Sequence, residues 1–176
     1  MTTFIDLLRQ RRSTRKFENR PVEEEKIEKI LRAALMAPSS KRSTPWHFVV
    51  VDEKEKLEKM AVSREMGSKF LENAPLAIVV LADDAKSSAW VEDASIAAIL
   101  MQLEAEDLGL GSCWVQVRER HKDESTTTEA YLQELIDAPS ELKIECIIAI
   151  GYKDEEKKPF DESKLQLDKV HRNSFS

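Results

Sequence analysis

The sequence predicts a single domain that contains both helices and strands, and three observations support this prediction. The chain has 176 residues, 41% hydrophobic and 34% charged, which is ordinary for one globular domain. Four short apolar runs, rich in β-branched or aromatic residues, are typical of strands. Between these runs, apolar residues recur at the spacing of amphipathic helices.

The elements alternate along the chain, and local residues justify their bounds. Acidic residues after Pro21 favour a helix start, Pro38 ends that helix, and the stretch Gly109-Leu110-Gly111 ends the longest one. The run from Leu76 to Ala82 has no polar residue, which predicts a strand covered on both faces. The predicted helices span residues 3–12, 21–36, 53–62, 88–108 and 127–136, and the predicted strands span residues 46–51, 76–82, 112–117 and 144–150.

The character of the chain changes after Tyr152. Residues 153–176 are polar with sparse apolar positions, so this tail cannot build a core of its own. It is either disordered or an arm that docks on another surface, and its spaced apolar residues favour the arm. The chain therefore divides into a domain at residues 1–152 and a C-terminal arm at residues 153–176.

Composition and charge argue against several classes of function. With 27 basic and 33 acidic residues the net charge is −6, so we expect no nucleic-acid partner. No apolar run approaches the ~20 residues of a membrane span and the N-terminus lacks a secretory pattern, so we expect no membrane partner and a cytoplasmic location. The three histidines have no metal-ligand spacing. Cys113 and Cys146 lie in apolar runs and are expected to be buried, reduced thiols.

The most informative feature is a basic segment, residues 9–16, that departs from the acidic background. An arginine presents a planar fork of donors that grips a phosphate or carboxylate at two points, and neighbouring hydroxyls add neutral donors. The segment therefore predicts an anion clamp, and a solvated basic face is the alternative. Its members are Arg9, Arg11, Arg12, Ser13, Thr14, Arg15 and Lys16, with Gln10 between the first two.

Two further stretches carry candidate ligand contacts. Residues 38–46, PSSKRSTPW, place hydroxyl and cationic side chains between two prolines, which suits a ligand better than a plain helix-to-strand linker. Residues 108–116, LGLGSCWVQ, contain glycines that let the backbone approach a helix or a flat ligand, and a helix cap followed by a strand is the alternative. We expect no basic side chain near Cys113 to lower its pKa, so this residue is interpreted as a packed thiol and not a nucleophile.

Taken together, these stretches resemble the FMN-dependent nitroreductase family, and the resemblance spans nearly the whole chain. The family's opening signature stands here as Arg11–Phe17, and its second signature as Ala37–Ser40 followed by Pro45–Phe48. A helix with an early acid, here Asp93, leads into the pattern L-G-L-G-x-x-W, and F-L-x-x-A-P precedes the strand at 76–82. Four motifs in the right order and spacing make the resemblance specific.

The resemblance implies an α+β fold with a mostly antiparallel central sheet flanked by helices. It implies an intertwined homodimer with FMN at the interface, in which each C-terminal arm crosses over and docks on the partner. The cofactor contacts are assigned to the basic segment, the loop of the other subunit, the end of the third strand and one basic residue in the tail. These positions are Arg11, Arg12, Ser13 and Arg15; Pro38, Ser39, Ser40 and Arg42; Gln116 and Val117; and Lys164. Arg9 and Lys16 are expected to be solvated.

The implied activity is that of a ping-pong oxidoreductase. NADH or NADPH passes a hydride to flavin N5 and leaves, and a nitroaromatic, quinone or related electron-poor acceptor then takes the electrons. Arg15 is expected to stabilise the anionic reduced flavin near N1 and O2. No side chain is expected to act as an acid, a base or a nucleophile, and no metal is implied.

The chain departs from the family pattern in two places, and two other functions remain open. Arg42 and Thr44 stand where the family usually has Asn and Gln, so Arg42 either adds a charge over the flavin, narrows the pocket, reaches an anionic acceptor or points to solvent. The stretch between Leu81 and Trp90 is too short for a lid, which predicts an open, permissive pocket. The alternatives are a same-fold enzyme with dehalogenase-like or flavin-cleaving chemistry, and a binding module for phosphate, nucleic acid or an acidic protein.

Overall fold

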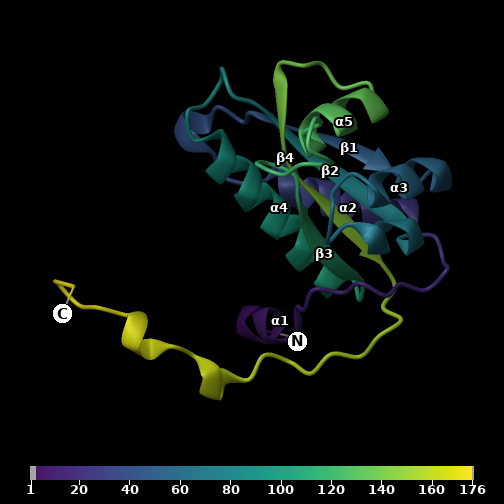
Figure 1. Ribbon diagram of the computed structural model, residues 1–176. Helices are drawn as coiled ribbons and strands as arrows, with labels where there is room; N and C mark the ends of the chain where they lie inside the picture. The colour runs from purple at the N-terminus through teal and green to yellow at the C-terminus, as the bar shows by residue number, and fades with distance from the viewer. Residues whose placement is uncertain (1–2, 176) are drawn as a thin grey trace.

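The computed structural model describes residues 3–175, and an antiparallel sheet with helices on both faces forms its centre (Figure 1). The strands are β1 (Trp46–Val51), β2 (Leu76–Asp83), β3 (Gly111–Gln116) and β4 (Leu142–Gly151), in the spatial order β1-β2-β4-β3. All three neighbouring pairs are antiparallel. The predicted α+β class is confirmed, and each strand bound lies within two residues of its predicted position.

Two layers of helices cover the sheet, one on each face. The five predicted helices are present as α1 (Phe4–Gln10), α2 (Glu24–Leu35), α3 (Lys54–Ala61), α4 (Trp90–Asp107) and α5 (Thr128–Leu135). Side chains of α2 and α4 share one apolar cluster with Ile78 and Val80, whereas α3 and α5 share the other with Ala77 and Val79. Because successive residues of a strand point to opposite faces and both faces are covered, β2 is apolar from Leu76 to Ala82, as predicted, and only Asp83 at its end is polar.

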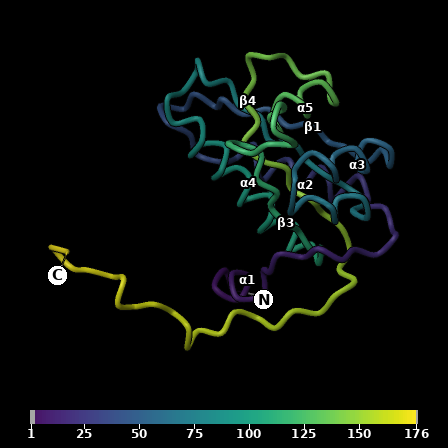
Figure 2. Tube along the Cα trace, in the orientation of Figure 1, coloured from purple at the N-terminus to yellow at the C-terminus, as the bar shows by residue number. Residues whose placement is uncertain are grey.

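The first part of the predicted arm is tied to the N-terminal segment of its own chain. Asp154 N donates to Lys16 O at 3.0 Å, and Phe160 N donates to Arg9 O at 2.8 Å. Beyond Phe160 the tail runs away from the sheet, and residues 160–175 are exposed throughout (Figures 1 and 2). Docking of this part on a partner stays a prediction. Ser176, the last residue of the predicted arm, lies outside the described residues, as do Met1 and Thr2, on which the expectation about a secretory signal partly rests.

Both cysteines are buried in the sheet, as predicted. Cys113 on β3 is 2% exposed and Cys146 on β4 is fully buried. Burial raises the pKa of the Cys146 thiol well above its ordinary value. Between residues 3 and 175, none of the helices combines the length and apolar character that crossing a membrane requires.

Candidate functional site

The basic segment lies beside the start of β3, and its side chains at residues 13–15 alternate between outward and inward directions, as in a strand. Thr14 is buried and its N–H donates to Ser112 O at 2.9 Å, while Ser13 forms an isolated parallel bridge with Ser112. The buried Ser112 hydroxyl accepts from Gln102 Nε2 of α4 at 3.3 Å. Because Thr14 faces inward, the side chains of its neighbours Ser13 and Arg15 are turned outward.

We predict that Gly111→Ala shifts the basic segment, because a Cβ at this glycine would lie 2.5 Å from Thr14 Oγ1. Overpacking of this kind costs about 1–3 kcal/mol of unfolding free energy. Urea denaturation measures this loss, and the matched background is Thr14→Gly, which removes the obstructing side chain. The cost of Gly111→Ala should largely disappear in the Thr14→Gly background. An equal cost in both backgrounds would contradict the steric explanation.

The outward side chains of the segment line a hollow of about 360 Å³. Four of its lining residues are cationic, none is acidic, and Ser13 adds a hydroxyl. The lining residues are Leu8, Arg11, Arg12, Ser13, Arg15, Lys157 and Phe160. Guanidinium forks, an ammonium group and a hydroxyl are the donors that a phosphate group requires. This donor set fits the phosphate end of a flavin mononucleotide.

Lys157 is a candidate phosphate contact that the sequence analysis missed, and the backbone of Lys158 holds Arg12 beside it. Lys157 Nζ donates to Ser13 O, and Lys158 O accepts from Arg12 Nη1 at 3.2 Å. The available signal was a basic pair directly before Pro159 in an otherwise acidic stretch. Lys164, the tail residue selected instead, lies further out with a 77% exposed side chain near Asp161. It lines a neighbouring hollow of about 680 Å³ together with Arg12 and Lys157.

Two expectations about the surroundings of the segment are wrong. Arg9 is not simply solvated, since its guanidinium pairs with Asp6 at 2.7 Å and with Glu162 of the tail, whereas Lys16 is exposed as predicted. Cys113 does have basic neighbours, because the charges of Arg15, Lys157 and Arg11 act on its thiol. Burial nevertheless raises the Cys113 pKa and the nearby charges only oppose this effect, so the interpretation as a packed thiol stands.

The loop at residues 38–45 is fixed by a buried carboxylate on α4. Asp93 is 3% exposed, accepts from Ser40 N at 2.8 Å and accepts from the Ser87 hydroxyl at 2.9 Å. Ser39 Oγ accepts from Thr44 N at 2.9 Å. Within this frame, residues 40–42 form a 3-10 turn that the sequence analysis placed in an irregular loop.

Three residues of this loop have left-handed backbone conformations. Lys41, Arg42 and Thr44 have φ values of 51°, 57° and 41°. Such values are uncommon without glycine and are unfavourable above all for β-branched Thr44. Strained backbone persists where surrounding contacts fix it, and it is concentrated at ligand-binding positions. Strain and anchoring together support the prediction that this loop meets a ligand and is more than a linker.

The loop and the basic segment are separated along α4 within one chain. Ser40 is bonded to Asp93, and Ser112 at the basic segment is bonded to Gln102. Nine residues from Asp93 to Gln102 correspond to about 13 Å along a helix axis. No residue of the loop lines the 360 Å³ hollow.

Gln116 and Val117, the predicted cofactor contacts at the end of β3, form hydrogen bonds with neighbouring residues of the same chain. Gln116 Oε1 accepts from Trp114 Nε1 at 2.8 Å, and Gln116 Nε2 donates to Arg118 O at 3.2 Å. Val117 is fully buried and its N–H donates to Glu145 O at 3.2 Å. Glu145 on β4 is itself 4% exposed, and its Oε2 lacks a hydrogen-bond partner among the described residues.

The buried Glu145 predicts a pH-dependent stability. Burial raises the pKa of this carboxyl, although the charge of Arg118 opposes the shift. The folded state thus holds the proton to higher pH than the unfolded state, whose carboxyl titrates near ~4.3. The stability that the proton contributes is present below that value and is lost as pH rises through the folded-state pKa.

Glu145→Gln, which imitates the protonated acid, is therefore expected to be more stable than the unchanged chain at neutral pH. The advantage should shrink as pH falls toward ~4. Urea denaturation over this pH range measures the difference, and exposed Glu141→Gln on the loop before β4 is the matched control. A difference that does not vary with pH would rule out the titration of Glu145.

Comparison with known proteins identifies the family. The Nitroreductase family model matches residues 8–66 and 61–152. An Archaeoglobus fulgidus protein described as an NADH dehydrogenase/NAD(P)H nitroreductase is 35% identical over 180 residues, covering 99% of this chain and 100% of the relative. The structure of an FMN-dependent nitroreductase from Clostridium difficile R20291 matches with a TM-score of 0.96 and 53% identity, covering 98% of this chain and 100% of the other. An iodotyrosine deiodinase of Thermotoga neapolitana is 25% identical over 193 residues, covering 94% of this chain and 96% of that protein. The chain therefore belongs to the nitroreductase family.

Proposed function

We propose that this chain is an NAD(P)H-dependent FMN oxidoreductase that reduces nitroaromatics, quinones or related electron-poor acceptors. The observation that carries the proposal is the hollow lined by Arg11, Arg12, Arg15 and Lys157 and by no acidic residue. Glu155 lies outside this lining, where it pairs with Lys157 at 3.3 Å. The acidic net charge of −6 makes this local concentration of cations more informative. The relative named an FMN-dependent nitroreductase, 53% identical, supports a flavin phosphate as the anion.

The residues of the hollow would bind and orient the cofactor. Arg11, Arg12 and Lys157 would hold the phosphate, the Ser13 hydroxyl would add a neutral donor, and Arg15 would place its charge beside the ring. When bound, FMN supplies hydride and electron transfer at N5 between NADH or NADPH and the acceptor, in a ping-pong cycle. The protein contributes binding, orientation and electrostatics, so no side chain is needed as an acid, a base or a nucleophile.

The same proposal includes a homodimer. The loop of one subunit, through Pro38, Ser39, Ser40 and Arg42, would reach the flavin held by the basic segment of the other. The separation of about 13 Å along α4 within one chain favours this arrangement. Exposed apolar residues on α1 and α4 form surface that a second copy would cover: Phe4 is 67% exposed, Ile5 52%, Ile96 37% and Ile99 38%. The tail beyond Phe160 would dock on the partner.

The acceptor pocket is proposed to be open. Asp83 ends β2 and Trp90 begins α4, so the connection is a short turn without a lid element. Arg42 is exposed in the loop and is proposed to add a positive charge at the pocket entrance. An open pocket favours a range of flat acceptors over a single enclosed substrate.

Spectroscopy of the purified chain tests the proposal. We expect FMN to bind with a flavin absorption band, and either NADH or NADPH to bleach this band without oxygen. A panel of nitroaromatics, quinones and iodotyrosine, scored by reoxidation of the reduced flavin, then identifies the acceptor. Ping-pong kinetics give parallel lines in double-reciprocal plots. A chain that takes up no added FMN would refute the proposal, and preferential reoxidation by iodotyrosine would favour the dehalogenase-like alternative.

A further inference from the structure

The buried Glu145 lies at an irregularity of the central sheet. On β4, Ile144 and Cys146 pair with consecutive residues of β2, so Glu145 between them has no partner on that strand. One extra residue of this kind forms a β-bulge, which redirects a side chain and is common beside functional sites. The bulge lies next to the end of β3, whose last residue pairs with Cys146.

The backbone of Glu145 holds the end of β3 in place. Its carbonyl oxygen accepts from both Val117 N and Arg118 N, each at 3.2 Å. Val117 and its neighbour Gln116 are proposed cofactor contacts. Glu145 is therefore bonded to the segment that is expected to meet the flavin ring.

The carboxyl group of Glu145 is enclosed by side chains from several elements. Glu145 is 4% exposed, and within residues 3–175 its Oε2 has no hydrogen-bond partner. Burial raises the pKa of this carboxyl, while the charge of Arg118 and the polar side chain of Gln116 oppose that shift. The groups coupled to its titration come from α4, β3, the loop after β3 and β4 itself; they are Ser95, Gln116, Arg118, Glu119 and Cys146.

The side-chain amide of Gln116 is bonded to groups other than Glu145. Gln116 Nε2 donates to Arg118 O at 3.2 Å, and Gln116 Oε1 accepts from Trp114 Nε1 at 2.8 Å. An ionised carboxylate beside this amide would attract its N–H, because hydrogen bonds to charged acceptors are stronger than those to neutral ones. The two bonds of the amide are therefore compatible with a neutral carboxyl at Glu145.

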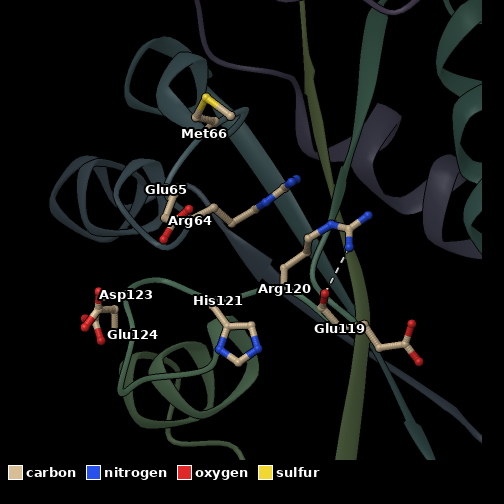
Figure 3. A pocket seen from close by; sticks show the side chains of 8 residues that line it. All are labelled: Arg64, Glu65, Met66, Glu119, Arg120, His121, Asp123 and Glu124. Carbon is tan, nitrogen blue, oxygen red and sulfur yellow. Dashed lines mark hydrogen bonds between the residues drawn. The ribbon is translucent and has the colours of Figure 1, made fainter.

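The cation beside Glu145 is also engaged elsewhere. The Arg118 guanidinium pairs with Glu119 at 2.7 Å. Figure 3 shows the Glu119 side chain pointing away from Arg120, which bonds instead to the backbone oxygen of Glu119 at 3.0 Å. A buried carboxylate without a bonded partner is costly, whereas the neutral acid is much less so. The observed bonds thus suit a protonated Glu145.

We propose that Glu145 is a positioning residue of the cofactor site, and that its proton keeps the Gln116 amide bonded to Trp114 and to the Arg118 backbone. When the proton passes to solvent, the carboxylate accepts an N–H of Gln116 and the amide turns. Gln116 Oε1 then leaves Trp114 Nε1, and the end of β3 presents different donors and acceptors. The consequence for the flavin rests on the proposed function, whereas the turn of the amide does not.

Proton NMR of the chain without cofactor tests the turn of the amide. The chain has three tryptophans, and Trp114→Phe identifies the indole N–H signal of Trp114. Loss of a hydrogen bond moves an N–H signal upfield, so we expect an upfield shift as pH rises from ~4 to ~8, with a midpoint above the ordinary value of ~4.3. Glu145→Gln should hold the signal at its low-pH position. Exposed Glu141→Gln is the matched control and should titrate like the unchanged chain. A signal that does not titrate, or that titrates equally in Glu145→Gln, would overturn the proposal.

Gln116→Met separates the turn of the amide from a direct effect of the Glu145 charge on the indole. Methionine is similar in size but has no amide, so the pH-dependent shift of the Trp114 signal should disappear in this variant. A shift of unchanged size would mean that the carboxylate acts on the indole without Gln116, and the proposed role of the amide would be wrong.

The FMN dissociation constant, measured by fluorescence titration at several pH values, tests the consequence for the cofactor. The FMN phosphate itself titrates near pH ~6, and comparison with Glu145→Gln removes this shared contribution. At neutral pH we expect the unchanged chain to bind FMN about two- to tenfold more weakly than Glu145→Gln, and the two constants should converge toward pH ~4. Equal constants at every pH would overturn the role of Glu145 at the cofactor site. A chain that binds no FMN refutes only the proposed function, since the indole titration still reports on Glu145.

Discussion

Replacing Arg11 and Arg15 together by alanine is expected to abolish FMN binding at micromolar concentrations while the fold persists. Both side chains line the 360 Å³ hollow, and neither contributes to the apolar clusters of the sheet. A hydrogen bond to a charged group contributes about 1.5–3 kcal/mol, so the loss of two raises the FMN dissociation constant roughly 10²- to 10⁴-fold. Fluorescence titration with FMN measures the constant, and urea denaturation of the cofactor-free chain measures the unfolding free energy.

Lys16→Ala is the matched control for this pair, because Lys16 belongs to the same basic segment but is exposed and lies outside the hollow. It should leave FMN affinity nearly unchanged. Equal losses in Lys16→Ala and in the double variant would mean that general positive charge attracts the anion. Retention of FMN by the double variant, with an unchanged unfolding free energy, would refute the assignment of the basic segment to the cofactor. Steep, salt-dependent binding to nucleic acid would instead favour the binding-module alternative.

The sequence was sufficient for those features that short-range patterns determine. β2 was predicted to within one residue because its apolar run has no polar interruption. The end of α2 was also predicted to within one residue, because Pro38 limits it, whereas its start lies three residues later than predicted. The basic segment was found because arginines that line one hollow also lie close together in the sequence. Each of these features depends on residues a few positions apart, whose periodicity or chemistry is visible before folding.

Features that depend on distant segments meeting could not be predicted in this way. Lys157 reaches Ser13 because the tail passes beside the N-terminal segment, and Arg9 meets Glu162 for the same reason. The left-handed conformations in the loop at 38–45 also escaped prediction, since nothing local favours them at Thr44. They persist because contacts such as that between Asp93 and Ser40 fix the loop from outside.

Asp93→Ala is expected to produce the largest loss of stability among the variants considered, about 2–4 kcal/mol of unfolding free energy. The substitution removes the acceptor for Ser40 N and for the buried Ser87 hydroxyl. Urea denaturation measures the loss, which corresponds to a fall in thermal midpoint of roughly 5–15 °C for a chain of this length. Because the carboxylate holds Ser40, the loop at residues 38–45 should also become more sensitive to limited proteolysis.

Two control variants separate the hydrogen bonds of Asp93 from its charge. Exposed Glu92 lies in the same first turn of α4 as Asp93, so its charge interacts with the helix dipole in a similar way. Glu92→Ala should therefore lose about 0.3–1 kcal/mol of unfolding free energy without releasing the loop at residues 38–45. Asp93→Asn keeps one oxygen acceptor for Ser40 N, so its cost should lie between those of Glu92→Ala and Asp93→Ala. Equal costs for Glu92→Ala and Asp93→Ala would mean that the dipole dominates. The ordered series would mean instead that one buried carboxylate maintains the strained loop. Loss of FMN from Asp93→Ala would then connect that strain to the cofactor.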